Sequence, residues 1–151
     1  MNRKSLLLTL LLLSPISEAN ESTYILGVGA GVGDYGESNI SRANYHVSLG
    51  YQYSESWGTE LNYLAEGSEL NLESYTLNLK RNFSLSKINE LYLKVGVVYY
   101  DYLKESGIGG AASAGWQLKF SKCLGVYTEY SYSYLGEVDT VALNVGFTYN
   151  F

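Results

Sequence analysis

The sequence has very little cysteine, histidine and proline. Its 151 residues include one Cys, one His and one Pro. A single Cys excludes a disulfide framework and a cysteine zinc site, and a single His excludes a multi-histidine metal centre. We therefore expect neither a metal ion nor another cofactor.

Charge is also scarce, at 17% of residues against about 25% in ordinary soluble proteins. Ten basic residues stand against fifteen acidic ones, a formal net charge of −5. This balance leaves no basic face to meet phosphates, so we expect no nucleic-acid partner. Tyr and Gly are abundant instead, with sixteen of each.

One short apolar run stands at the start of the chain. Arg3 and Lys4 precede the leucine-rich residues 6–13, and Ser17-Glu18-Ala19 follows as a small-x-small cleavage site. This pattern is typical of a secretory signal peptide, so we expect residues 1–19 to be a signal and 20–151 the mature domain. The run is too short to anchor that domain, because a spanning helix needs about 20 apolar residues.

From residue 24 onward, bulky apolar residues alternate with glycine and small polar ones. The alternation repeats eight times and predicts strands over residues 24–33, 45–53, 57–65, 74–83, 91–102, 110–120, 124–134 and 141–151. The connections after the first, third, fifth and seventh strands are longer and acidic, with Asp34, Glu37, Glu66, Glu69, Glu73, Glu105, Glu137 and Asp139. This pattern favours external loops alternating with short periplasmic turns, which places both termini in the periplasm.

The bulky face must lie outside. A soluble barrel of the lipocalin kind would also alternate, but the interior of eight strands holds only a modest filling of side chains. The face of glycine, serine, asparagine and threonine fits inside, whereas the bulky face does not. Lipid must then cover the bulky face, because it far exceeds the apolar patches of soluble monomers. We predict an all-β fold, an eight-stranded antiparallel up-and-down transmembrane β-barrel.

The aromatic residues fit two interfacial girdles. One girdle, at the turn ends, holds Tyr24, Tyr53, Trp57, Phe83, Phe120, Tyr149 and Phe151, and the other, at the loop ends, holds Tyr45, Tyr63, Tyr75, Tyr99, Tyr132 and Tyr134. Arg81 interrupts the lipid face near the periplasmic end, where a charged side chain costs little because it can reach the interface.

The mature chain resembles the small outer-membrane barrels typified by the transmembrane domain of OmpA, with OmpX-like barrels next. The resemblance is carried by the segments "WGTELNYLAEG", "LYLKVGVVYYDY", "TEYSYSY" and "VALNVGFTYNF". It implies a monomer in the cell outer membrane, surrounded by outer-membrane lipid and lipopolysaccharide. The last segment is similar to the C-terminal signal that the barrel assembly machinery recognises, and its residues are Leu143, Val145, Phe147, Tyr149 and Phe151.

Four charged residues fall on the inner face of the predicted strands: Glu60, Lys80, Lys94 and Glu129. Unpaired charges there would be costly, so we expect a hydrogen-bonded network. In the OmpA family such pairs act as a gate, and the resemblance places Glu60 and Lys80 at its strand-three acid and strand-four base. Gln117 and Tyr127 stand where the family has an acid and an Arg. A static ion-pair plug and a narrow gated pore remain as two hypotheses.

His46 is expected to be a hydrogen-bonded interior residue. The alternative is a catalytic base in a lipid-modifying enzyme, with Ser48 on the same face as its partner. No matching catalytic segment appears and the pair faces inward, so we expect no enzymatic activity. Cys123 is expected to be a free thiol in a periplasmic turn.

Two functional hypotheses follow. The first is an integral outer-membrane protein with a structural or envelope role, a filled interior, no wide pore and no peptidoglycan-binding domain. The alternative is a surface adhesin or interaction module acting through its extracellular loops, whose acidic residues could also hold divalent cations that bridge lipopolysaccharide. Binding of cells to the immobilised barrel, before and after protease trimming of the loops, separates the two hypotheses.

Overall fold

The computed structural model describes residues 23–35, 41–66, 72–102, 105–136 and 138–151. The predicted signal peptide over residues 1–19 lies outside these ranges, as do Glu37, Glu69 and Glu137. None of the described residues lies in a helix long and apolar enough to span a bilayer.

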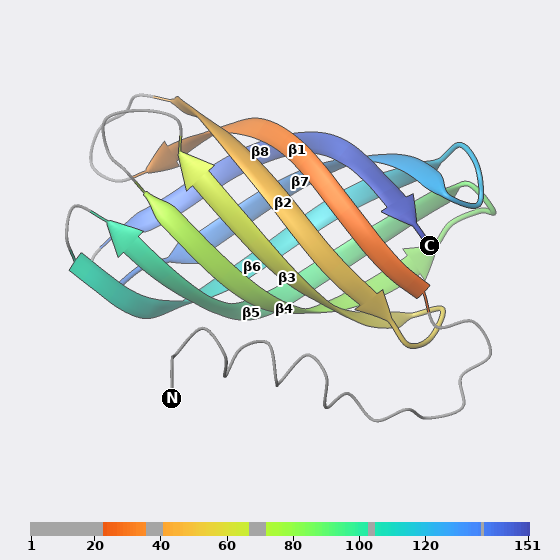
Figure 1. The fold of residues 1–151 in the computed structure, drawn as a ribbon, viewed down its shortest axis with the longest axis horizontal. Helices are drawn as coiled ribbons and strands as arrows, with labels where there is room; N and C mark the ends of the chain where they lie inside the picture. Colours follow the sequence, from red (N-terminus) through yellow and green to blue (C-terminus); the bar gives the residue numbers. More distant parts are fainter. Residues whose placement is uncertain (1–22, 36–40, 67–71, 103–104, 137) are drawn as a thin grey trace.

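Eight strands form one closed antiparallel barrel, which confirms the predicted fold (Figure 1). The strands are β1 (Thr23–Tyr35), β2 (Arg42–Gln52), β3 (Trp57–Glu66), β4 (Glu73–Ser84), β5 (Asn89–Tyr102), β6 (Glu105–Lys119), β7 (Leu124–Tyr134) and β8 (Asp139–Asn150). Each strand pairs with the next, and β8 returns to β1, where Val28 stands opposite Val47 on one side and Phe147 on the other. Closure leaves a continuous backbone hydrogen-bond ladder around the barrel.

The two ends of the barrel differ. Four-residue turns follow β2, β4 and β6 at one end, which we call the turn end; the opposite end is the loop end. The connections after β1 and β3 hold six residues each, as expected, but those after β5 and β7 hold only two and four, so the expectation of longer loops there was wrong, because these strands extend beyond the apolar alternation. The C-terminus lies at the turn end beside the start of β1, where Tyr24 and Phe151 exchange backbone hydrogen bonds of 3.2 and 3.0 Å (Figure 1). At the loop end, Gly136 adopts a φ of 81°, which glycine accepts without strain, in the connection between β7 and β8.

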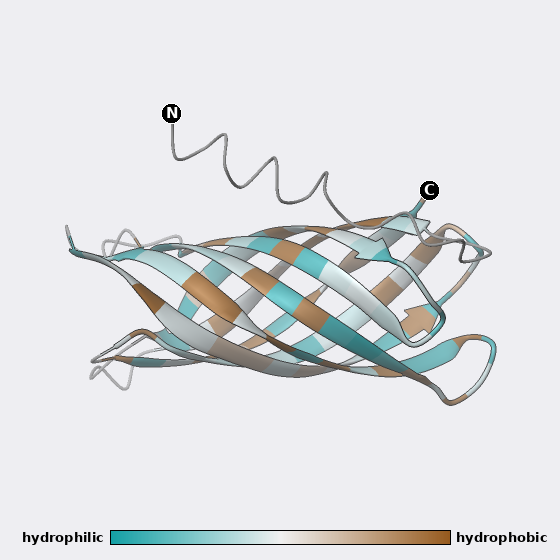
Figure 2. Cartoon of the chain, turned by 90° about the horizontal axis from the view of Figure 1, so that it is seen from below, coloured by the Kyte–Doolittle hydropathy of each residue, from teal (hydrophilic) through white to brown (hydrophobic). Residues whose placement is uncertain are grey.

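The bulky side chains point outward and the small polar ones inward, as predicted. Leu26, Val95 and Phe147 are 40%, 58% and 63% exposed, whereas Asn78 and Asn144 are 5% and 3% exposed. Figure 2 shows the apolar and polar residues alternating along the strands. Aromatic rings pair at both ends, with centroids 4.9 Å apart for Tyr24 and Tyr51 and 5.0 Å for Tyr63 and Tyr75.

Inward-facing glycines make room for inward-facing tyrosines. A Cβ added at Gly115 would collide with the Tyr92 ring, and one added at Gly146 would lie 2.7 Å from the Tyr127 hydroxyl. The alternating glycines therefore set how much side-chain volume the narrow interior accepts.

Several strands are longer than the apolar alternation indicates. The largest difference is at β6, which begins at Glu105 rather than at residue 110. Five acidic residues that we expected in connections lie within strands: Asp34, Glu66, Glu73, Glu105 and Asp139. The alternation marks only the part of a strand that contacts an apolar environment, whereas backbone pairing continues beyond it.

Candidate functional site: the barrel interior

A buried lysine joins two carboxylates across the middle of the barrel. Lys94 Nζ lies 2.6 Å from Glu60 Oε1 and 2.6 Å from Glu129 Oε2, so a side chain of β5 bridges β3 and β7. The Tyr92 hydroxyl donates a 2.9 Å hydrogen bond to Glu129 Oε2. All four side chains are less than 10% exposed, so these ions depend on one another for stabilisation.

Lys80 does not join this ion pair. Lys80 stands directly opposite Lys94 in the β4–β5 register, and its Nζ lies 4.3 Å from the centroid of the Tyr92 ring. Among the described residues Lys80 forms no salt bridge. Because Lys94 already holds both carboxylates, the aromatic face supplies the stabilising contact for the second cation. The structure thus brings together three of the four predicted charges and places the fourth against a tyrosine.

His46 contacts a tyrosine rather than a serine. Its Nε2 is hydrogen-bonded to the Tyr127 hydroxyl, while Nδ1 has no partner in the described part of the chain. The expected hydrogen-bonded interior role is thus what the structure shows. Ser48, the candidate nucleophile, makes no hydrogen bond to His46 within the described ranges. A nucleophile needs a hydrogen-bonded base, and this pair does not supply one.

Two further ion pairs lie nearer the ends of the barrel. At the turn end Lys119 Nζ is 2.8 Å from Glu90 Oε2, and at the loop end an Arg42 guanidinium nitrogen is 3.7 Å from Glu66 Oε1. Sequence reasoning missed both pairs because Glu90, Arg42 and Glu66 lie beyond the predicted strand boundaries, which left Lys119, on the inner face of the predicted strand 110–120, without a visible partner. Ion pairs therefore lie at both ends of the inner face as well as at its centre.

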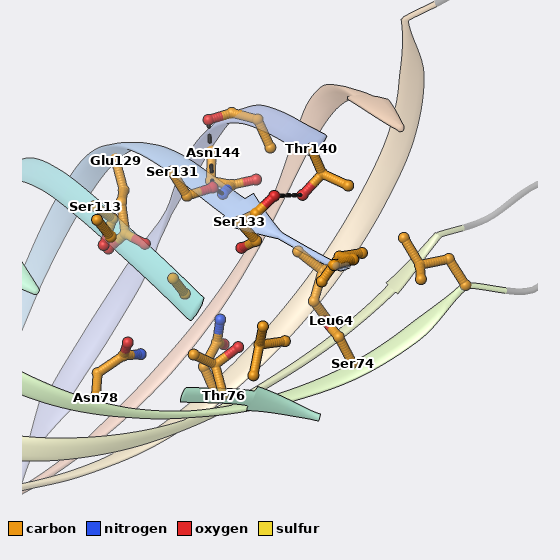
Figure 3. A pocket seen from close by; sticks show the side chains of 17 residues that line it. Leu64, Ser74, Thr76, Asn78, Ser113, Glu129, Ser131, Ser133, Thr140 and Asn144 are labelled. Atoms are coloured by element: carbon orange, nitrogen blue, oxygen red, sulfur yellow. Dashed lines mark hydrogen bonds between the residues drawn. The ribbon is translucent and has the colours of Figure 1, made fainter. Parts of the chain in front are cut away.

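A small polar chamber of about 40 Å³ lies on the loop-end side of the central ion pair (Figure 3). Hydroxyl and amide side chains from several strands line it: Asn62, Ser74, Thr76, Asn78, Ser113, Ser131, Ser133, Thr140 and Asn144. Asn144 Nδ2 donates to Ser131 Oγ at 3.5 Å, and the Thr140 hydroxyl donates to the Ser133 carbonyl at 3.4 Å. The chamber is polar and large enough for ordered water.

An apolar cluster closes the interior toward the loop end. Leu72, Val98 and Leu135 are 2%, 1% and 6% exposed, and Leu64 and Tyr100 pack against them. This cluster separates the polar chamber from an open vestibule of about 230 Å³ at the loop end, since Leu72 and Leu135 line both. The sequence signal for the cluster is that Leu64 and Val98 are apolar residues on the otherwise polar faces of their strands. The expectation of a polar interior overlooked this signal.

The described interior pairs most of its buried charges and is filled with side chains at the level of the central ion pair. Within the described ranges no three His, Cys, Asp or Glu side chains gather as a metal site requires. A vestibule of about 490 Å³ opens at the turn end, lined by Gln52, Glu90 and Lys119 among others. Between that vestibule and the polar chamber, the side chains of Glu60, Lys80, Tyr92 and Lys94 fill the barrel.

A closed antiparallel barrel with an apolar outer face and a polar, filled interior defines the class of small transmembrane β-barrels. The chain belongs to the outer membrane protein β-barrel domain family, whose model matches residues 5–151. Members of this family are bacterial outer-membrane proteins, so the outer membrane is the location that the family supports.

Solved structures agree on the fold. The N-terminal β-barrel domain of Pseudomonas aeruginosa OprF is 15% identical with a TM-score of 0.69. Neisserial surface protein A is 15% identical with a TM-score of 0.66, and Ail, the attachment invasion locus protein of Yersinia pestis, is 17% identical with a TM-score of 0.63. Each match covers 87% of this chain and 100% of the other. No curated protein sequence matches this one.

Proposed function

We propose that the protein is a monomeric integral outer-membrane barrel with a closed interior and a structural role in the envelope, and that it has no enzymatic activity. The observation that carries this proposal is Lys94 held between Glu60 and Glu129 at the centre of the barrel. The apolar cluster of Leu72, Val98 and Leu135 supports it by adding a second closure. The two closures are chemically independent, because one is ionic and the other excludes water by its apolar surface.

The proposal includes how the barrel reaches the membrane and what surrounds it there. Residues 1–19 direct export, and the barrel assembly machinery recognises the outward face of β8. That face is open to a partner, because the side chains of Leu143, Val145, Phe147, Tyr149 and Phe151 are 47–63% exposed. Phospholipid and lipopolysaccharide then cover the outer face, with the turn end in the periplasm.

We expect the barrel to stay closed in planar lipid bilayers, both as the wild type and as the Glu60→Ala variant. Removing one carboxylate leaves the Leu72, Val98 and Leu135 cluster in place, so no continuous path for water opens. Single-channel recording measures this, with Glu55→Ala in an exposed turn as the matched control. Conductance steps in Glu60→Ala alone would favour the narrow gated pore instead.

Labelling of Cys123 tests the orientation. Cys123 is an exposed free thiol in the turn between β6 and β7. We expect a membrane-impermeant maleimide to label it only after the outer membrane is permeabilised, because the turn end faces the periplasm. As the control, Ser106→Cys in a Cys123→Ser background places a thiol at the loop end, where intact cells should be labelled. The reverse pattern would contradict the orientation.

One observation favours the adhesin alternative. At the loop end, residues 105–109 of β6 pair with β5 but not with β7, whose pairing with β6 begins at Gly110 and Tyr134. A strand edge that is not paired in a ladder can accept an extended segment of another protein. The comparison of cell binding before and after loop trimming tests this second function.

A further inference from the structure

Arg81 is the one basic residue of the described strands that lies on the outward face. Lys80, Lys94 and Lys119 point inward, and the other described bases lie in turns or at the inner loop end. The side chain of Arg81 is exposed, on β4 near the turn end. A cation on this surface needs an explanation, because its neighbours there are apolar.

Two aromatic rings hold the guanidinium group. Arg81 Cζ lies 4.8 Å from the centroid of the Trp57 ring and 5.4 Å from that of Phe83. Trp57 is directly opposite Arg81 in the β3–β4 register, and Leu93 of β5 is opposite on the other side. The rings fix the position of the charge without neutralising it.

No carboxylate of the described residues neutralises this charge. Among the described residues Arg81 forms no ion pair, and the outward-facing acids of the neighbouring strands, Glu73 and Asp101, lie at the loop end. The Trp57 indole N–H likewise has no acceptor within the described ranges. The site therefore presents a planar cation and a hydrogen-bond donor toward whatever covers the outer face.

From this geometry we propose that Arg81, Trp57 and Phe83 form a binding site for the phosphate group of an anionic glycerophospholipid in the periplasmic leaflet. The inference rests on the proposed function, because it requires the turn end to lie at that leaflet. Guanidinium groups bind phosphate in a bidentate manner, and Trp is suited to the headgroup level. The phosphate supplies the counter-ion that the described part of the chain does not.

The two tryptophans of the chain provide a matched experiment. The Trp116→Phe variant leaves Trp57 beside Arg81. The Trp57→Phe variant leaves Trp116, which faces outward with Leu91 and Thr128, rather than a base, opposite it on the neighbouring strands. Each variant is reconstituted in phosphatidylcholine vesicles that contain brominated phosphatidylglycerol or brominated phosphatidylcholine. Quenching of the remaining tryptophan gives the relative affinity of the two lipids at that position.

We expect Trp57 to report about a fivefold preference for phosphatidylglycerol, as one basic residue near an anionic lipid surface provides. Trp116 should report none. Adding Arg81→Gln to the Trp116→Phe variant should abolish the preference, and Arg81→Lys should retain part of it. Heat-modifiable gel mobility verifies that each variant is folded.

Equal preference at both tryptophans, or a preference that survives Arg81→Gln, would overturn the lipid site. The comparison of Trp57 with Trp116 needs no change at Arg81, so it remains decisive even if Arg81→Gln does not fold. An inserted barrel without lipid preference overturns this inference alone. A chain that inserts into neither vesicle overturns the proposed function as well.

Discussion

Replacing Lys94 by methionine should lower the free energy of unfolding by about 3–5 kcal/mol, because it leaves two buried carboxylates without their shared counter-ion. Lys94 lies 2.6 Å from both Glu60 and Glu129, and no other described base forms an ion pair with either of them. Urea unfolding of the barrel in lipid vesicles, followed by tryptophan fluorescence and gel mobility, measures the change.

Two controls separate a charge effect from a general effect of substitution. Lys87→Met, in the exposed turn after β4, should change the free energy of unfolding by less than about 0.5 kcal/mol. Combining Lys94→Met with Glu60→Gln and Glu129→Gln removes all three charges and should recover part of the loss. A loss below about 1 kcal/mol for Lys94→Met would show that the carboxylates find water or another partner.

Substituting valine for Gly96 should cost about 3 kcal/mol or more, or prevent folding, because the interior of β5 has no room for a side chain. A Cβ at Gly96 would collide with the Leu77 carbonyl oxygen and the Asn78 amide, and would lie 2.9 Å from the Leu77 carbonyl carbon. Backbone cannot move aside as a flexible side chain can. The fraction of heat-modifiable, folded protein and its urea midpoint measure the effect.

Gly110 offers the matched control, since it faces outward on β6 and a Cβ there would have no neighbour within 4 Å. Gly110→Val should leave the stability within about 0.5 kcal/mol of the wild type or raise it slightly, because valine favours strands and suits an apolar surface. Equal effects of Gly96→Val and Gly110→Val would contradict the assignment of inner and outer faces.

The alternation of residue size predicts the fold well because it reflects a geometric constraint. Val95, Phe147 and their outward neighbours cannot fit inside eight strands, whereas Gly96 and Asn144 can. Strand ends are less predictable, because beyond the apolar band backbone pairing tolerates any side chain. This is why residues 105–109, with two glycines among them, were missed as part of β6.

The sequence predicts which side chains face the interior, but not which of them contact one another. Periodicity assigns a residue to the inner face, so Glu60, Lys94 and Glu129 could be found. Which interior side chains contact one another depends on the position of each strand along the barrel axis and on its tilt. These place Lys80 against Tyr92 rather than against a carboxylate. Leu72 and Leu135 flank strands rather than lie within them, so no periodicity indicates that they close the barrel.

The ion pairs also constrain how the chain enters the bilayer. Glu60, Lys94 and Glu129 come from β3, β5 and β7, so no two of them lie on strands that are neighbours in the sheet. The β7–β8 hairpin inserted by itself would carry Glu129 into hydrocarbon without a counter-ion, at a cost of several kcal/mol. The charges of Glu60, Lys94 and Glu129 are neutralised only when the sheet curves enough to bring β3, β5 and β7 together. We therefore expect insertion and closure of the cylinder to be coupled in this chain, rather than a succession of independently inserted hairpins.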